Sequence, residues 1–277
     1  MEKISRKMSI YAKLFREALK EIPHDKWKCD DCGSINTEWF VDMKELKSTG
    51  KIEYIAGICQ TCNEKIEKKI KEDKQKAENI RKQKKIKLLL KESKIPPKIS
   101  TCKFGNLKIR KGAELAFKTM KRLDKADRWI YLYGDNNVGK SLIIGAAINK
   151  LAQNLTSCYY LNERSFFQRI KNTYNNNSNE SIYTIFESLK KADVIFWDDF
   201  AMYIYSDHDA GIAYDIFEHC DTYYKKLVLI SNIDLKDNMK NEIQIVNDRI
   251  GQRNVARLKR NNLFYLQMKN KPFDNFS

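Results

Sequence analysis

The sequence predicts an α/β domain over residues 95–277, built from a parallel sheet with helices on both faces. Three observations lead to this fold class. Short apolar runs typical of buried strands alternate with amphipathic runs typical of helices. A glycine-rich loop follows the first of these strands and opens a helix, and two adjacent acidic residues end a later strand. Such an alternation is typical of strands joined by helical crossovers.

The expected elements follow in chain order. Strand-like runs lie at residues 129–134, 158–162, 194–200 and 226–232, and helical runs lie at 141–153 and 163–174. The polar stretch 173–181 is expected to form a surface loop. Four aromatic residues on these runs have the residue type that stacks on bases, but their positions favour core packing: Tyr159, Tyr160, Phe166 and Phe167.

Residues 134–141 read GDNNVGKS and match the pattern G-x-x-x-x-G-K-[ST] in full. Glycines permit the backbone dihedrals that turn N–H groups toward phosphate. The lysine ammonium is expected at the β- and γ-phosphates of ATP, and the serine hydroxyl at Mg²⁺. The alternative, a chance glycine-rich turn, is disfavoured by the strand before the loop and the helix after it. The expected nucleotide ligands are Gly134, Asp135, Asn136, Asn137, Val138, Gly139, Lys140 and Ser141.

Polar residues that end two later strands complete this expected site. Asp198 is expected to hold Mg²⁺ directly or through water, and Asp199 to polarise the attacking water as general base. Two aspartates that merely end a strand are the alternative. Asn232 ends another strand and is expected to orient water at the γ-phosphate, although Ser-Asn is also common in turns.

Four arginines follow at spacings of four, four and three: Arg249, Arg253, Arg257 and Arg260. These spacings predict one face of a helix. The face is either a source of an arginine finger for a neighbouring subunit's nucleotide, with the other arginines on nucleic-acid phosphate, or a solvated basic surface. The residues alone leave both interpretations open.

Two C-x-x-C pairs occur near the start of the chain: Cys29, Cys32, Cys59 and Cys62. Four thiolates from two such pairs complete a tetrahedral Zn²⁺ site. Two β-prone runs around Gly50 fit a zinc-ribbon-like module, whose small core the metal would supplement. A redox pair and an iron–sulfur cluster are the rival interpretations.

Charge and composition divide the chain further. Residues 1–63 form the predicted zinc-binding module, 64–94 a basic helical linker, and 95–277 the α/β domain. The linker holds 13 basic and 6 acidic side chains without Gly or Pro, and it is expected to be a solvated helix. The net charge of +16 favours a polyanionic partner, nucleic acid before an anionic membrane. No apolar run approaches 18 residues and no export signal is visible, so a cytoplasmic protein is expected.

The α/β domain resembles the bacterial helicase-loader ATPases of the DnaC and DnaI type, a branch of the AAA+ superfamily. The resemblance rests on the segments KIPPKISTCKFGNL, GDNNVGKS, FWDDF, LVLISN and GQRNVARLKR. It implies an AAA+ domain without a separate lid, with an arginine finger at Arg257 and Arg253 one turn before it. Subunits would assemble side by side, with each ATP between Lys140 of one subunit and Arg257 of the next.

The same resemblance implies a function. The N-terminal module would grip a DnaB-type replicative helicase, and the ATPase domain would bind single-stranded DNA in a bacterial cell, from a host or a phage gene. ATP hydrolysis to ADP and phosphate would be weak alone and stimulated by DNA or by the partner. Two alternatives remain. A transposition-helper ATPase of the IstB type would prefer duplex DNA, and a zinc-ribbon nucleic-acid adaptor would bind ATP without useful turnover.

Overall fold

The structure is a computed structural model of the 277-residue chain. It describes residues 27–28, 32–33, 35–36, 40–41, 54–55, 60–109, 111–126, 129–175, 179–234, 249–261 and 263–269. The chain divides into two compact units, Met1–Ile80 and Arg81–Ser277. None of the helices in the described ranges has the length and apolarity needed to cross a bilayer.

The first unit contains two pairs of short antiparallel strands. Strand β1 (Trp27–Lys28) pairs with β2 (Ile35–Asn36), and β3 (Phe40–Val41) pairs with β4 (Tyr54–Ile55). The β3–β4 pair confirms the two β-prone runs predicted around Gly50.

The helix predicted for the basic segment is α3, which runs from Gln60 to Glu92. Apart from the buried Cys62, the side chains described between residues 61 and 88 are exposed or half-buried. The expectation of a solvated helix is therefore confirmed. The division between the two units, at Ile80 and Arg81, falls within this helix.

The second unit is built on a parallel sheet of five strands with the order β6-β7-β8-β5-β9. The strands are β5 (Ile130–Gly134), β6 (Cys158–Asn162), β7 (Val194–Asp198), β8 (Lys226–Ser231) and β9 (Phe264–Met268). The predicted α/β class is confirmed, and the four predicted strands agree to within two residues at each end. The edge strand β9 was not predicted.

Helices cover both faces of this sheet because side chains alternate along every strand. On β5, Ile130 and Leu132 pack on one face, whereas Tyr131 and Tyr133 pack on the other. The first face is covered by α4 (Pro97–Ser100), α5 (Glu114–Lys121) and α6 (Lys140–Gln153). The second is covered by α7 (Glu163–Asn172), α8 (Ile182–Lys190), α9 (Asp207–Thr222) and α11 (Gln252–Arg260).

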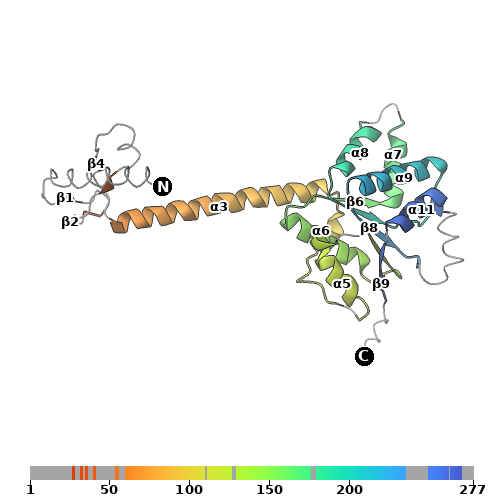
Figure 1. The fold of residues 1–277 in the computed structure, drawn as a ribbon, viewed down its shortest axis with the longest axis horizontal. Coiled ribbons are helices and arrows are strands. Elements are labelled where there is room, and N and C mark those ends of the chain that lie inside the picture. Colours follow the sequence, from red (N-terminus) through yellow and green to blue (C-terminus); the bar gives the residue numbers. More distant parts are fainter. Residues whose placement is uncertain are drawn as a thin grey trace, which may run out of the picture. The chain divides into compact units, whose positions relative to one another are not determined.

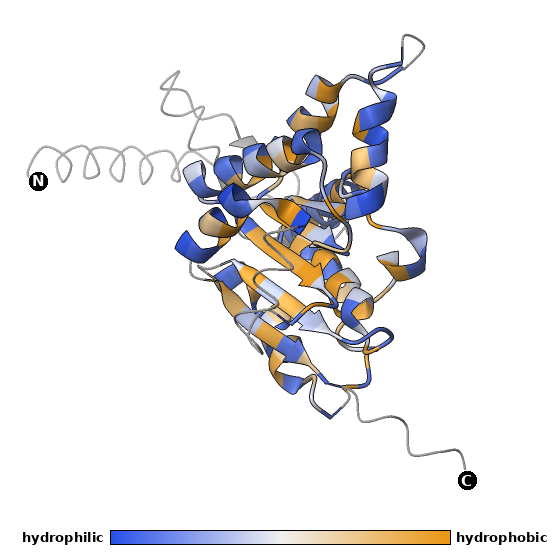
Figure 2. Cartoon of the chain, turned by 90° about the vertical axis from the view of Figure 1, so that its right-hand side faces the viewer, coloured by the Kyte–Doolittle hydropathy of each residue, from blue (hydrophilic) through white to orange (hydrophobic). Residues whose placement is uncertain are grey.

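Figure 1 shows α5 and α6 on one side of the strands and α7, α8 and α9 on the other. Figure 2 shows hydrophobic residues concentrated on the strands, while the helices carry both hydrophilic and hydrophobic residues. All four aromatic residues predicted for the core between residues 158 and 174 are buried. The carboxyl ends of β5, β7 and β8 lie along one edge of the sheet, where the predicted nucleotide ligands follow them.

Candidate nucleotide-binding site

The predicted phosphate loop connects β5 directly to α6. Gly134 ends the strand at φ +150°, and a Cβ placed on it would lie 2.1 Å from the carbonyl oxygen of Met268 on β9. Only glycine fits where these two backbones approach so closely. Gly139 precedes α6 with φ +97°, a left-handed conformation. The loop thus ends at a helix N-terminus, whose free N–H groups favour an anion.

Lys140 lies at the centre of the loop. Its Nζ donates hydrogen bonds to the carbonyl oxygens of Gly134 (2.7 Å) and Asp135 (2.8 Å) and to Oδ1 of Asn232 (2.7 Å). Burial lowers the pKa of Lys140, and the nearby carboxylates of Asp198 and Asp199 oppose this effect. An ammonium held by three exchangeable acceptors can transfer these bonds to phosphate oxygens, which carry more charge.

Asn232 connects two parts of the site. Besides accepting from Lys140, its Nδ2 donates to Oδ1 of Asn136 at 2.8 Å. The structure therefore brings the end of β8 to the phosphate loop, as the sequence predicted for a residue that senses the γ-phosphate. The role of this amide in orienting water stays a prediction.

Asp198 ends β7 and is almost enclosed, with 8% of its surface exposed. Its Oδ2 accepts a hydrogen bond from the hydroxyl of Tyr160 at 2.7 Å, and its Oδ1 accepts from the backbone N–H of Asp199 at 3.0 Å. Burial raises the pKa of Asp198, the Tyr160 bond opposes this, and the charge of Asp199 adds to it. A divalent cation at this edge would stabilise the ionised form of the desolvated carboxylate, because it supplies a positive charge close by.

Asp199 is exposed and lies beside Asp198 with an unusual backbone. Its φ of +57° is in the left-handed region, which a non-glycine residue adopts only when its surroundings enforce it. Asn162, at the end of β6, donates from Nδ2 to Oδ2 of Asp199 at 2.6 Å. The Oδ1 of Asn162 also accepts from the N–H of Ser165 and so caps α7.

The segment after Asp199 is fastened to the neighbouring strand β8. The N–H of Phe200 donates to the carbonyl oxygen of Ile230 at 2.8 Å, and the hydroxyl of Ser231 donates to the carbonyl oxygen of Phe200 at 2.8 Å. Ser231, which lies in the predicted strand at residues 226–232, thereby helps to place the acidic pair.

A cavity of about 80 Å³ lies beside the phosphate loop. Its apolar walls suit the flat face of a nucleoside base. The walls include Leu107, Ile109, Phe117, Val138, Leu142 and Met268. This cavity has no signal in the sequence because it combines segments that are far apart along the chain.

The arginines are not all on one helix. Helix α11 begins at Gln252, and Gly251 before it has φ +84°, so Arg249 belongs to the preceding segment. The prediction of a common helix face is therefore wrong for Arg249, whose Nη1 instead donates to the carbonyl oxygen of Ala201 at 2.8 Å. Arg253 is exposed.

Arg257 is held by α9 of its own chain. Its guanidinium pairs with Glu218, donates to Oδ2 of Asp221 at 2.6 Å and to the hydroxyl of Tyr214 at 3.1 Å, and only 11% of the side chain is exposed. A role as arginine finger stays a prediction, and it requires phosphate to replace these partners. Sequence reasoning missed them because α9 was not predicted.

The four cysteines are only partly within the described residues. Cys32 is exposed and lies between β1 and β2, whereas Cys62 is buried in the first turn of α3. Cys29 and Cys59 lie outside the described residues. Within the described part of the chain, no group of three or more His, Cys, Asp or Glu side chains could hold a metal ion. The zinc site therefore stays a prediction.

Comparison with known proteins addresses the fold. No protein-family model matches the sequence, and no curated protein matches it. Among solved structures, the DnaC helicase loader gives a TM-score of 0.53 at 14% identity, over 63% of this chain and 100% of that one. The second unit has the AAA+ ATPase fold.

Two further solved structures share this fold. DnaA from Aquifex aeolicus, bound to AMPPCP, gives a TM-score of 0.52 at 19% identity, over 64% of this chain and 53% of that one. The DnaI structure gives a TM-score of 0.50 at 16% identity, over 64% of this chain and 93% of that one. The present chain thus spans about half the length of the DnaA structure. The predicted likeness to DnaC and DnaI is confirmed at the level of the fold.

Proposed function

We propose that the protein is an ATP-dependent helicase loader, which binds a DnaB-type replicative helicase and delivers it onto single-stranded DNA. The observation that carries the proposal is the joining of Lys140, Asn232 and the Asp198–Asp199 pair at one edge of an AAA+ sheet. The match to the DnaC helicase loader over its whole length supports a loader in preference to the longer DnaA initiators.

ATP and Mg²⁺ fit this edge. Lys140 would exchange its carbonyl partners for the β- and γ-phosphates, and the residues of the loop from 134 to 139 would surround the phosphate chain. Ser141, exposed at the start of α6, and Asp198 would hold Mg²⁺, which would neutralise phosphate charge. Asp199 is the exposed carboxylate of the pair and would act as general base, with Asn232 orienting water.

The N-terminal module, residues 1–63, would contact the helicase, with Zn²⁺ bound by the two cysteine pairs. The pairing of β1 with β2 places Cys32 in a short hairpin, and Cys62 lies in a helix first turn, two settings that suit paired thiolate ligands. The segment 64–94 would act as linker and 95–277 as ATPase. The surplus of basic side chains supports contact with single-stranded DNA in the bacterial cytoplasm. Self-association would bring Arg253 and Arg257 to a neighbour's nucleotide.

Capture experiments with the full-length protein test the proposal. A DnaB-type hexamer is the bait, with ATP, ADP or no nucleotide, and hydrolysis is measured in parallel with single-stranded or duplex DNA. We expect capture by the wild type, loss of hydrolysis in Lys140→Ala, and loss of capture but retained ATP binding in Cys32→Ser. Lys150→Ala, on the far turn of the same helix, is the matched control for Lys140→Ala.

Other outcomes would redirect the assignment. No capture under any nucleotide condition, together with stimulation by duplex DNA, would favour a transposition helper. ATP binding without hydrolysis under every condition would favour an adaptor. Either result would refute the loader proposal.

A further inference from the structure

The AAA+ domain buries a carboxylate whose partners all belong to one loop and the strand before it. Glu163 is the first residue of α7 and is 0% exposed. Its Oε2 accepts hydrogen bonds from Nε1 of Trp197 (3.1 Å), from the N–H of Ala201 (2.8 Å) and from the hydroxyl of Tyr205. Its Oε1 accepts from the N–H of Met202 at 3.1 Å. A carboxyl group buried so completely needs such a set of hydrogen-bond partners to replace the water it has lost.

The loop that Glu163 holds, residues 199–206, carries backbone strain. Asp199 and Ala201 both have positive φ, +57° and +59°, although neither is glycine. Such conformations persist only where the surroundings enforce them. The N–H groups of Ala201 and Met202, bound by Glu163, directly follow the strained segment. The Glu163 carboxylate therefore stabilises the loop in a backbone conformation that Asp199 and Ala201 would not favour by themselves.

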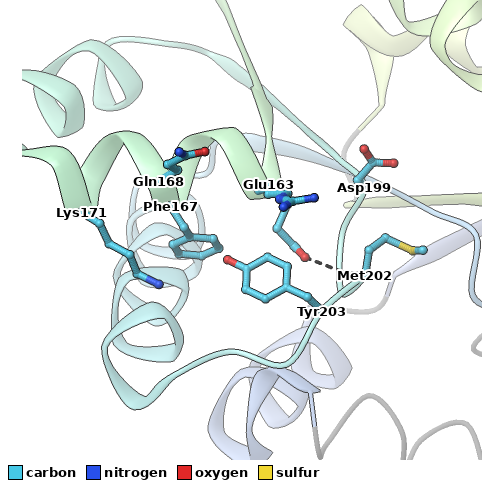
Figure 3. Close-up of a pocket in the computed structure, with 8 residues that line it drawn as sticks. Glu163, Phe167, Gln168, Lys171, Asp199, Met202 and Tyr203 are labelled. Carbon is cyan, nitrogen blue, oxygen red and sulfur yellow. Dashed lines mark hydrogen bonds between the residues drawn. The ribbon is translucent and has the colours of Figure 1, made fainter.

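One side of this loop borders a cavity. A cavity of about 740 Å³ lies between α7 and the loop, and its walls include Phe167, Lys171, Met202 and Tyr203. Figure 3 shows Glu163 reaching from α7 to the backbone at Met202, with Asp199 at the far end of the same loop. The Tyr203 ring packs against Phe167 of α7, whereas Met202 is exposed, so the hydrogen bonds of Glu163 add a direct restraint on the backbone at Ala201 and Met202.

Two consecutive residues, the last of β6 and the first of α7, thus hold the two ends of the strained segment. Asn162 binds the carboxylate of Asp199, and Glu163 binds the backbone two and three residues later. The first contact orients the side chain of Asp199, and the second fixes the direction in which its backbone leaves β7.

We propose that Glu163 is a positioning residue for Asp199: it holds the loop after β7 so that the Asp199 carboxylate faces the water that attacks ATP. This inference rests on the proposed ATPase function and adds a residue to it. Glu163 touches neither nucleotide nor metal in this assignment. Its loss should therefore change turnover, not nucleotide affinity.

Steady-state hydrolysis tests the inference with full-length protein, Mg²⁺, single-stranded DNA and helicase present. Glu163→Gln keeps the shape but turns one acceptor oxygen into a donor group that faces donors. Because a small misplacement of a reacting group is costly, we expect kcat to fall roughly ten- to a hundred-fold. The KM for ATP and the binding of a fluorescent ATP analogue should stay within about two-fold of the wild-type values.

Two other variants complete the design. Tyr205→Phe removes one donor to Glu163, and kcat should fall by a smaller factor of about three to ten, since one bond of four is lost. Asp209→Asn changes another buried acid, which is hydrogen-bonded to Lys171 and Ser206 and not to the segment from Asp199 to Met202, and it should keep kcat even if thermal stability falls. A purely structural role for Glu163 would lower stability without separating kcat from KM.

The outcomes are distinct. If the wild type hydrolyses ATP and Lys140→Ala does not, but Glu163→Gln and Tyr205→Phe keep kcat within two-fold, the inference is refuted and the proposed function stands. If Glu163→Gln does not fold, the kcat of Tyr205→Phe decides in the same way. If the wild type itself shows no hydrolysis with DNA and helicase present, the ATPase proposal fails and this inference fails with it.

Discussion

Replacing Tyr160 by phenylalanine removes one oxygen atom from the nucleotide site and should have two measurable effects. The Tyr160 hydroxyl lies 2.7 Å from Oδ2 of Asp198, and both residues are buried. A hydrogen bond to a charged acceptor contributes about 1.5–3 kcal/mol, and its loss leaves a desolvated carboxylate with one donor fewer. For a domain of this size, 1 kcal/mol corresponds to roughly 2–4 °C in Tm, so a loss of about 2 kcal/mol predicts a decrease of roughly 4–8 °C.

The second effect concerns pH. The Tyr160 bond lowers the pKa of Asp198 against the effect of burial, so its removal lets that pKa rise. Hydrolysis that needs ionised Asp198 should then fall at a higher pH than in the wild type when the medium is acidified. Scanning calorimetry and a pH–rate profile measure the two effects.

The matched control for this variant is Tyr159→Phe. Tyr159 is equally buried on the opposite face of the same strand, and its hydroxyl accepts from Arg169 at 3.0 Å, away from the site. It should lose some stability without moving the acid limb of the profile. If both variants moved the acid limb equally, or if Tyr160→Phe changed neither Tm nor the profile, our account of Asp198 would be wrong.

Four further predictions concern other parts of the chain. Gly134→Ala should destabilise the domain by at least about 3 kcal/mol, because its Cβ would meet Met268, whereas Gly211→Ala on an open face of α9 should be neutral or slightly stabilising; calorimetry compares them. Burial raises the pKa of Glu163 from 4.5 to about 7, so the folded state holds this proton more tightly than the unfolded state. Its contribution to stability should fall as pH rises from about 4.5 to 7, by at most about 3 kcal/mol, and Glu163→Gln should lack that decline in Tm measured across pH. Arg253→Ala should leave Tm within about 1 °C because the side chain is exposed, whereas Arg257→Ala should lower Tm through lost contacts with Glu218 and Asp221. If Arg257 is an arginine finger, adding the Arg257→Ala variant to wild-type protein should also lower the ATP hydrolysis of the wild-type subunits. Zinc analysis should find one ion per chain, and a chelator should abolish helicase capture while ATP binding persists; a metal-free protein that still captures helicase would contradict the zinc assignment.

The elements that sequence reasoning recovered carry local signals. The strand at residues 158–162 agrees with β6 in full, and the loop motif predicts the turn from β5 to α6 because its glycines are required by backbone geometry. Lys140 was assigned from the loop motif and Asn232 from its position at a strand end, and Nζ of Lys140 lies 2.7 Å from Oδ1 of Asn232. Periodicity and loop chemistry are sufficient for these features.

The missed features depend on which strands are neighbours. Tyr160 reaches Asp198 and Asn162 reaches Asp199 only because β6 pairs with β7 in one register, in which Asn162 lies opposite Asp198. Strand order is not encoded in any local pattern. The partners of Arg257 were also missed, because they lie on α9, a helix far from Arg257 along the chain. Glu163 was missed because a single acidic residue after a strand has no sequence signature.

The position of β5 in the sheet has a consequence for synthesis on the ribosome. This strand comes first in the AAA+ sheet, yet both its neighbours come last: β8 ends at Ser231, and β9 ends at Met268. Gly134 is enclosed by the backbone of Met268 itself. Contacts so distant along the chain form slowly, and these contacts cannot form until residues 264–268 have left the exit tunnel. The phosphate loop is therefore translated well before β9, and a nascent chain has no competent nucleotide site until β9 is available.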